Sequence, residues 1–426
     1  MKKRITLLAL IGVFSAGSAL ASGWRIPEQS VNSTALSGAY VANAHGADAA
    51  YFNPANMSFA DEKERWQVEV DAMYIHLNSV EFEHLTTPIM DGDSKKEDFL
   101  LPLFHLVSPE FSNMRLGLSF TVPGGLAKRW DDPYQGATAG EFSLEVLELN
   151  PSLSYKLHER VSIAAGVRGV YSKGRVSSDA QGAFTGSPLL TTVSRELEGD
   201  SIDEGYNLAL TVNPLENLTT AVTWRSRVDL TLEADDLTLR STGLIPALTD
   251  QLYSGGGSVT VPLPEVLTVA AAYSMGNTTV EISWDRTFWS DYKQLDFDYD
   301  AAIALTPILQ AAFDTPQARD YNDADAFRIG VTQKLLEERL TLMAGFAIDK
   351  TPVPDHSLGF ELPDSDAKIY SVGCKYKLND QYELGLAYLY DDKEERQLRL
   401  DDNNAIVGEF TNAAAHLVTI GLNTTF

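Results

Sequence analysis

Apolar and polar side chains alternate with a period of two residues over most of this chain. Val161, Ile163 and Val167 fall on one face of such a segment, whereas Ser162 and Arg168 fall on the other. This period is typical of β-strands, whose successive side chains point to opposite faces. The alternation recurs about fourteen times, near 65–79, 99–108, 114–122, 141–157, 161–176, 194–212, 218–233, 258–275, 278–289, 324–335, 340–348, 367–378, 382–392 and 412–426.

The connections between these segments alternate between short and long. Residues 276–277 and 379–380 are tight polar turns, whereas 234–257 and 290–323 are long connections. In transmembrane barrels the short turns lie on the periplasmic side and the long loops face outward. The sequence therefore predicts an all-β fold, a transmembrane antiparallel β-barrel of about fourteen strands built from residues 61–426.

The first 21 residues have the pattern of a secretion signal. Lys2, Lys3 and Arg4 precede an apolar stretch at 5–14, and small residues at 19–21 mark a cleavage site. No other segment approaches the roughly 18 uninterrupted apolar residues that a membrane helix needs. A chain that spans a membrane without such helices must do so as a closed barrel, because only then are all backbone groups hydrogen-bonded in lipid.

Two strands carry patterns that need interpretation. In 141–157 the apolar positions change phase, and a β-bulge near Val146 would reconcile them. In 218–233 apolar residues alternate with Arg225, Arg227 and Asp229, and we expect this charged face to line the lumen. Glu145 is expected to face the lumen as well.

Composition narrows the function. The formal net charge is −26, and loss of the basic leader makes it more negative, which argues against nucleic acid as a partner. A single cysteine, Cys374, excludes an intramolecular disulfide framework. We find no nucleophile elbow, zinc motif or phosphate loop, so we expect no enzyme, metal or cofactor. A Ser-His-acid triad is assembled in space rather than in sequence and stays an alternative.

The segment after the leader carries an ordered set of motifs, namely Gly23, Glu28-Gln29-Ser30, Gly38-Ala39-Tyr40, Asp48-Ala49-Ala50 and Asn53-Pro54-Ala55. This set resembles the start of mature proteins of the FadL family of outer-membrane transporters. Segments near 263–265, 284–293 and 349–364 are also similar to that family, so the likeness spans the mature chain.

The resemblance implies a function and a location. FadL-type proteins take up long-chain fatty acids and, in some branches, aromatic hydrocarbons. The chain would lie in the Gram-negative outer membrane, with residues 22–60 as a plug inside the lumen. The ligand would be captured by loops, the plug would move, and the ligand would leave sideways through the wall. We expect a monomer that contacts outer-membrane lipids. The terminal Phe426 is similar to the last residue of proteins inserted by the barrel-assembly machinery.

Candidate ligand-binding residues lie in the long loops and in the lumen. Two apolar loop segments are interpreted as short amphipathic helices that either capture a hydrophobic ligand or pack together as a lid. Asn53, Pro54, Pro123 and Gly124 are the candidate gating residues, because proline and glycine mark turns and interrupted strands. The candidate ligand-binding residues are Leu237, Leu239, Leu244, Ile245, Leu248, Leu252, Ile308, Leu309 and Phe313 in the loops, and Arg168 and Arg225 in the lumen.

Other functions fit parts of the same pattern. The first alternative is an aromatic hydrocarbon channel of the same family, in which no lumen arginine need bind a carboxylate. The second is a structural or adhesive surface barrel that works through its acidic loops. A soluble periplasmic β-protein would also alternate and carry a signal, but a sandwich rarely places all its short turns on one side.

Overall fold

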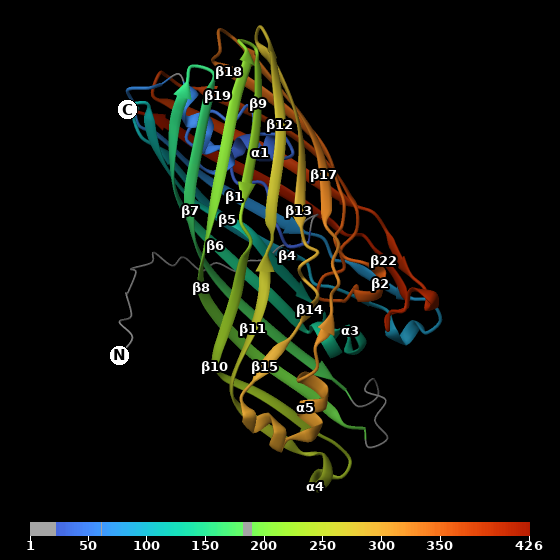
Figure 1. Cartoon of the computed structure of the whole chain (residues 1–426). Coiled ribbons are helices and arrows are strands. Elements are labelled where there is room, and N and C mark those ends of the chain that lie inside the picture. Colours follow the sequence, from blue (N-terminus) through green and yellow to red (C-terminus); the bar gives the residue numbers. More distant parts are fainter. Residues whose placement is uncertain (1–22, 61, 182–189) are drawn as a thin grey trace, which may run out of the picture.

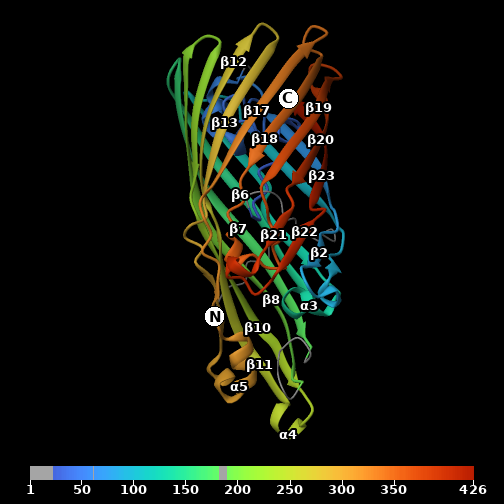
Figure 2. The same ribbon diagram turned by 90° about the vertical axis from the view of Figure 1, so that its right-hand side faces the viewer.

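The computed structural model describes residues 23–60, 62–181 and 190–426, so the expected signal peptide at 1–21 lies outside the described residues. The chain forms a closed antiparallel barrel of fourteen strands, as expected (Figures 1 and 2). It closes where β1 pairs with both β4 and β23. The wall consists of β1 (Gln67–Leu77), β4 (Glu97–Val107), β5 (Met114–Arg129), β6 (Glu141–His158), β7 (Val161–Ala180), β8 (Thr192–Leu215), β9 (Leu218–Arg225), β10 (Val228–Thr242), β11 (Gln251–Leu263), β12 (Glu265–Met275), β13 (Thr278–Phe288), β15 (Phe297–Tyr299), β17 (Ala324–Leu335), β18 (Leu340–Asp349), β19 (Ala367–Lys377), β20 (Tyr382–Lys393) and β23 (Ala414–Thr425).

Three wall strands consist of two segments each, namely β9 with β10, β11 with β12, and β13 with β15. The loop elements gather toward the lower end in Figure 1, opposite the short turns. Among the described residues, every helix is too short or too polar to cross a bilayer. The loop elements are β2 (Glu81–His84), β3 (Gly92–Asp93), β14 (Gln294–Leu295), β16 (Gln317–Ala318), β21 (Arg396–Leu398), β22 (Gly408–Thr411), α3 (Pro133–Ala139), α4 (Pro246–Thr249), α5 (Pro307–Phe313), η2 (Pro88–Met90), η3 (Ala301–Leu305), η4 (Asp355–Ser357) and η5 (Leu400–Asp402).

The wall changes polarity along its height, as β7 illustrates. Near the short turns Val167 points outward and Arg168 is buried inside. Farther along the same strand Lys173 and Arg175 point outward and Val176 is buried inside. The first arrangement suits a wall with lipid outside, and the second suits a wall with water outside. We call the second zone the extension; it comprises β10, β11 and the adjoining ends of β6, β7 and β8.

This reversal corrects the prediction for 218–233. Arg225 does face the lumen, but Ser226 is also buried and the alternation restarts there, so Arg227 and Asp229 point outward. Arg227 pairs with Asp229 at 2.6 Å on the outer surface. The single charged face predicted from the sequence is therefore two faces, one on each side of the membrane boundary.

The bulge predicted near Val146 is also misplaced. β6 stays in phase with β7 through this region, and Glu145 points outward rather than into the lumen. Val146 is apolar and inward because it belongs to the extension. The extra residue lies in the neighbouring strand β5, between Thr121 and Gly124. As a result, β5 continues through Pro123 to Arg129, well beyond its predicted end at 122.

Residues 23–60, which we call the N-terminal segment, are almost entirely buried among the wall strands. The segment contains α1 (Val31–Ala35), α2 (Ala49–Phe52) and η1 (Pro54–Phe59). α1 packs against β18, β19, β20 and β23, whereas η1 packs against β5, β6, β7 and β8. The approach is close: a Cβ atom at Gly345 of β18 would overlap the backbone of Leu36.

Asn53 and Pro54 lie within the N-terminal segment and do not lead directly into the wall. Pro54 begins η1, and the chain enters β1 only at Gln67. The Asn53 side chain donates to the Val41 carbonyl at 3.0 Å and to Thr211 Oγ1 at 2.9 Å. Asn53 therefore ties two parts of the N-terminal segment to each other and to β8.

Glu281 of β13 holds the middle of the N-terminal segment. Its buried carboxylate accepts three backbone hydrogen bonds, from Val41 at 2.6 Å, Ala42 at 3.0 Å and Asn43 at 2.6 Å. Hydrogen bonds to a charged acceptor each contribute about 1.5–3 kcal/mol. One wall residue thus fixes a stretch of chain that has little apolar area of its own.

The polarity reversal can be tested with one matched pair of substitutions. Leu208→Lys places a charge on the lipid-facing wall opposite Ala165, midway between the short turn and the boundary, and should lower the free energy of unfolding by about 2 kcal/mol or more. Thr231→Lys places the same charge on the outward face of β10 in the extension and should change it by less than about 0.5 kcal/mol. Urea titration in lipid vesicles measures both. Equal losses in the two variants would contradict the assigned boundary.

Replacement of the Glu281 carboxylate should loosen the N-terminal segment. In Glu281→Gln an amide nitrogen replaces one acceptor oxygen and opposes a backbone N–H, so we expect frequent opening events in planar-bilayer conductance recordings. Ser283→Ala is the control, because Ser283 is the next inward position and its hydroxyl has no hydrogen-bond partner in the described chain. A Glu281→Gln channel as silent as the parent would show that other contacts suffice.

Candidate ligand cavity and wall opening

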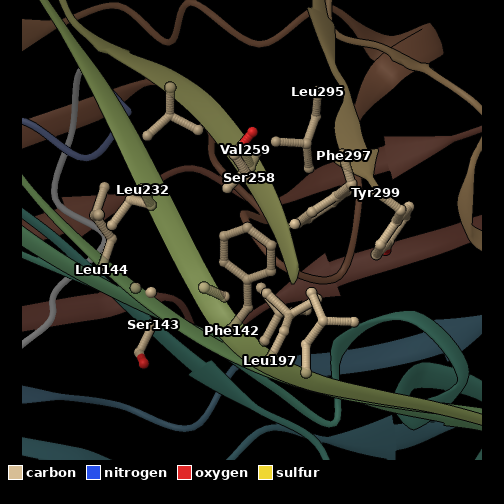
Figure 3. A pocket seen from close by; sticks show the side chains of 17 residues that line it. Phe142, Ser143, Leu144, Leu197, Leu232, Ser258, Val259, Leu295, Phe297 and Tyr299 are labelled. Carbon is tan, nitrogen blue, oxygen red and sulfur yellow. The ribbon is translucent and has the colours of Figure 1, made fainter. Parts of the chain in front are cut away.

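The interior of the extension is an apolar cavity (Figure 3). Phe142, Leu197 and Phe297 point into it from three different strands. It offers only about 40 Å³ to the centre of a water-sized sphere, so a hydrophobic ligand must displace side chains to enter. The remaining apolar lining includes Leu144, Val176, Leu232, Ala234, Leu237, Val259, Val261, Leu295 and Tyr299.

An aromatic cluster closes the inner end of this apolar region. Trp24 of the N-terminal segment meets Trp289 edge-on at 4.4 Å between ring centroids and Tyr292 at 5.4 Å. Tyr292 meets Tyr321 at 5.1 Å. Burial raises the pKa of Tyr292 to about 12, so this phenol stays neutral. The buried apolar residues form one continuous cluster from Trp24 to Phe313.

β4 and β5 are paired over only part of their length, and we call this gap in the pairing the wall opening. These strands share only four paired positions, from Val107–Gly117 to Phe104–Phe120, although β4 continues to Glu97. The pairing stops just before the extra residue of β5. A largely polar outer cavity of about 370 Å³, measured for the centre of a water-sized sphere, borders this part of the wall. Phe99 of β4 and Ala127 of β5 line it, together with outward charged residues of β6 and β7 such as Glu145 and Lys173. The Arg129–Glu97 ion pair, at 2.6 Å, lines the same cavity and joins the two strands there.

The N-terminal segment occupies the edge of β5 that β4 leaves free. Ile26 N–H donates to the Pro123 carbonyl at 2.9 Å, and Gly125 N–H donates to the Trp24 carbonyl at 2.8 Å. The Gln29 side chain accepts from Val122 N–H at 2.8 Å and donates to the Val122 carbonyl at 2.9 Å. Pro123 and Gly124 therefore lie where the wall, the opening and the N-terminal segment meet.

The lumen arginines that we considered as carboxylate anchors already have a carboxylate partner. Arg168 binds Glu148 at 2.8 Å and donates to the Ser226 carbonyl at 2.6 Å. Arg225 binds the other oxygen of Glu148 and lies over the Tyr51 ring at 4.3 Å. The Glu148 carboxylate thus binds one arginine through each oxygen, and these contacts hold β6, β7 and β9 together.

The structure separates the loop candidates into different roles. Leu237 and Leu239 lie in β10 and are buried inside the extension, so the prediction that they belong to an exposed helix is wrong. Leu252 lies in β11 and points outward. Only Leu244, Ile245 and Leu248 surround a helix, α4, and all three are exposed.

The second predicted helix is present as α5. Leu309 and Phe313 are buried against the extension, and Ile308 is half-buried beside them. α5 packs on β10 and β11 and thus covers the outer end of the cavity. Figure 1 shows α5 beside these strands, with α4 beyond them at the tip.

Several lining residues escaped the sequence prediction. Phe142, Val176, Leu197 and Val259 were assigned to strands but not to a cavity. Their signal was present, because apolar residues on these strands change face just where the outward positions become charged. A sequence search for that change of face would have found the extension.

A family model described as outer membrane protein transport protein (OMPP1/FadL/TodX) matches residues 12–426. Outer membrane protein P1 of Haemophilus influenzae is 26% identical in an alignment that covers 99% of each chain. The long-chain fatty acid transport protein of Salmonella typhi is 26% identical over 71% of this chain and 72% of that protein.

Solved structures share the fold at lower identity. A FadL homologue of Pseudomonas aeruginosa superposes with a TM-score of 0.77 at 17% identity, covering 95% of this chain and 99% of that one. The toluene transporter TodX of P. putida gives 0.70 at 16% identity, covering 93% and 98%. The chain therefore belongs to the OMPP1/FadL/TodX family of outer-membrane proteins that transport hydrophobic compounds.

Proposed function

We propose that this protein is a passive channel for long-chain fatty acids. The loops around α4 capture the ligand, which enters the apolar interior of the extension. The N-terminal segment acts as a plug, and its movement lets the ligand leave sideways between β4 and β5. In this role Asn53 and Pro54 hold the plug, whereas Pro123 and Gly124 shape the exit.

The contact between the N-terminal segment and the free edge of β5 carries this proposal. The same residues, from Trp24 to Gln29, border the aromatic end of the apolar region and bond to β5 at the opening. A ligand that displaces these residues from the aromatic end of the apolar region would also expose the free edge of β5 at the opening. The residues Leu100 and Pro102 of β4 point outward beside the opening, so the exit leads toward lipid.

Aromatic hydrocarbons are the alternative ligand class. The cluster around Trp24 and Trp289 favours them, because aromatic rings stack edge-on with a flat apolar ligand. Complementation separates fatty-acid transport from the structural or adhesive role. A host that lacks its own fatty-acid transporter should grow on oleate when it makes this protein, whereas an adhesive barrel would restore no growth.

Removal of the extra residue of β5 should close the exit. Deletion of Pro123 restores the two-residue period against β6 and frees β5 to pair with β4 beyond Phe120. We expect oleate uptake to fall at least about tenfold, with folding retained, since each added ladder bond contributes about 1 kcal/mol. Pro123→Ala keeps the residue count and serves as the control. Undiminished uptake in the deletion variant would rule out exit at this place.

The exposed residues around α4 should serve capture alone. Serine at Leu244, Ile245, Leu248 and Leu252 removes an exposed apolar patch outside the buried core, so the barrel should fold normally. Uptake should fall several-fold at low ligand concentration and recover at high concentration. Serine at Leu85 and Leu400, which are also exposed but lie in other loops, is the control. If both sets behave like the parent protein, the α4 patch takes no part in capture.

A further inference from the structure

Two acidic residues of β1 are buried inside the barrel without a partner of opposite charge. Glu69 and Asp71 occupy successive inward positions of this strand and are 0% and 2% exposed. In the described chain no N–H group donates to any of their four carboxyl oxygens, and no basic nitrogen lies within 4.0 Å of them. The two carboxyl groups nevertheless lie within hydrogen-bond distance of each other. A buried charge normally has a partner, because it loses the stabilisation of water.

The charged groups that face this pair do not compensate it. Asp48 of the N-terminal segment is a third buried carboxylate beside the pair. Its own oxygens accept from Asn32 at 2.8 Å and from Tyr40 at 3.0 Å. Lys375 of β19 acts on the pair only from beyond 4.0 Å and is bound to Glu383 of β20 at 2.7 Å. Full ionisation would thus place three negative charges near one lysine that already has a partner.

The pair lies between the wall and α1. A Cβ atom at Gly421 of β23, opposite Asp71, would overlap an Asp71 oxygen and the side chain of Val31. The Val31 N–H attracts Asp71 without reaching hydrogen-bond geometry. His105 of β4 is opposite Glu69, and its ring is bonded to the N-terminal segment at 2.8 Å. The charge of the pair therefore acts directly on the segment that fills the lumen.

A cavity approaches the pair from the end of the barrel that carries the short turns. Its volume is about 800 Å³, measured for the centre of a water-sized sphere, and it lies between the N-terminal segment and the wall. Gln67 and Asn423 line it, and each has a buried side-chain atom without a hydrogen-bond partner in the described chain. Asn423 is opposite Glu69, and Gln67 is the preceding inward residue of β1. One layer of polar side chains thus separates Glu69 from the cavity.

We propose that Glu69 is a proton-binding site that locks the N-terminal segment in the lumen. Glu69 holds one proton and donates it to Asp71, because two touching carboxylates in a buried space repel each other strongly unless one is protonated. When this proton passes to water in the cavity, Glu69, Asp71 and Asp48 repel one another, and the segment that carries Asp48 is released.

The lock is therefore closed at low pH and opens as the pH rises. Because short turns face the periplasm in such barrels, the site responds to periplasmic pH. This inference rests on the proposed role of the N-terminal segment as a plug and adds a condition under which the plug moves.

The first measurement is the frequency of opening events in planar-bilayer recordings as the pH is raised. In the parent it should rise at least about tenfold between about pH 6 and about pH 9, because the ionised fraction of the carboxyl group rises with pH. Glu69→Gln should change less than about twofold, since its amide donates to Asp71 at every pH. Asp48→Asn removes the repelling charge and should also flatten the response. Glu338→Gln is the control, because Glu338 lines the same cavity but is exposed and bound to Lys334 at 3.3 Å; it should respond like the parent.

Infrared difference spectra detect the proton itself. The C=O band of a protonated carboxyl group should be present in the parent, absent in Glu69→Gln, and lost over the pH range in which the channel opens. The proposal would be overturned by a parent without this band, by a Glu69→Gln channel that opens with pH like the parent, or by opening that follows calcium at fixed pH. Growth of the complemented host on oleate is measured in parallel. Failure to grow with the pH response intact would overturn transport and leave the proton lock standing.

Discussion

The change of solvent outside the wall is the constraint on which the rest of this structure depends. Where lipid surrounds the barrel, outward side chains must be apolar and every backbone group must be bonded within the wall. Where water surrounds it, the same strands turn charges outward and bury apolar residues inside. β6, β7 and the β9–β10 strand all make this change at one level, between Glu148 and Val146, at Arg168 and Val170, and at Arg225 and Val228.

The interiors of the two zones differ in polarity. The membrane zone has a polar interior filled by the N-terminal segment, which is held by groups such as Glu281 and the Glu148 ion pairs. The extension has an apolar interior with little empty space. A hydrophobic molecule that enters from outside thus meets apolar surface first and a bonded polar core second. The break between β4 and β5 lies beside the junction of the two.

The sequence was sufficient to predict the barrel, because period-two alternation depends only on local chemistry. The strand at 324–335 was predicted with the bounds that β17 has. The errors arose where one rule was applied across two solvents: Arg227 and Asp229 were placed inside, and Leu237 and Leu239 were assigned to a helix. The wall opening and the partners of Arg168 and Arg225 depend on contacts between distant strands. No local pattern encodes such contacts.

The bonding of the N-terminal segment to β5 has a mechanical consequence. Trp24, Ile26 and Gln29 complete the edge of a wall strand and also border the inner end of the apolar region. Withdrawal of these residues would leave the Val122, Pro123 and Gly125 backbone groups without partners at the same moment as the lumen is uncovered. In the proposed pathway, exit through the wall and opening of the lumen would therefore be coupled, because both require the same residues to move.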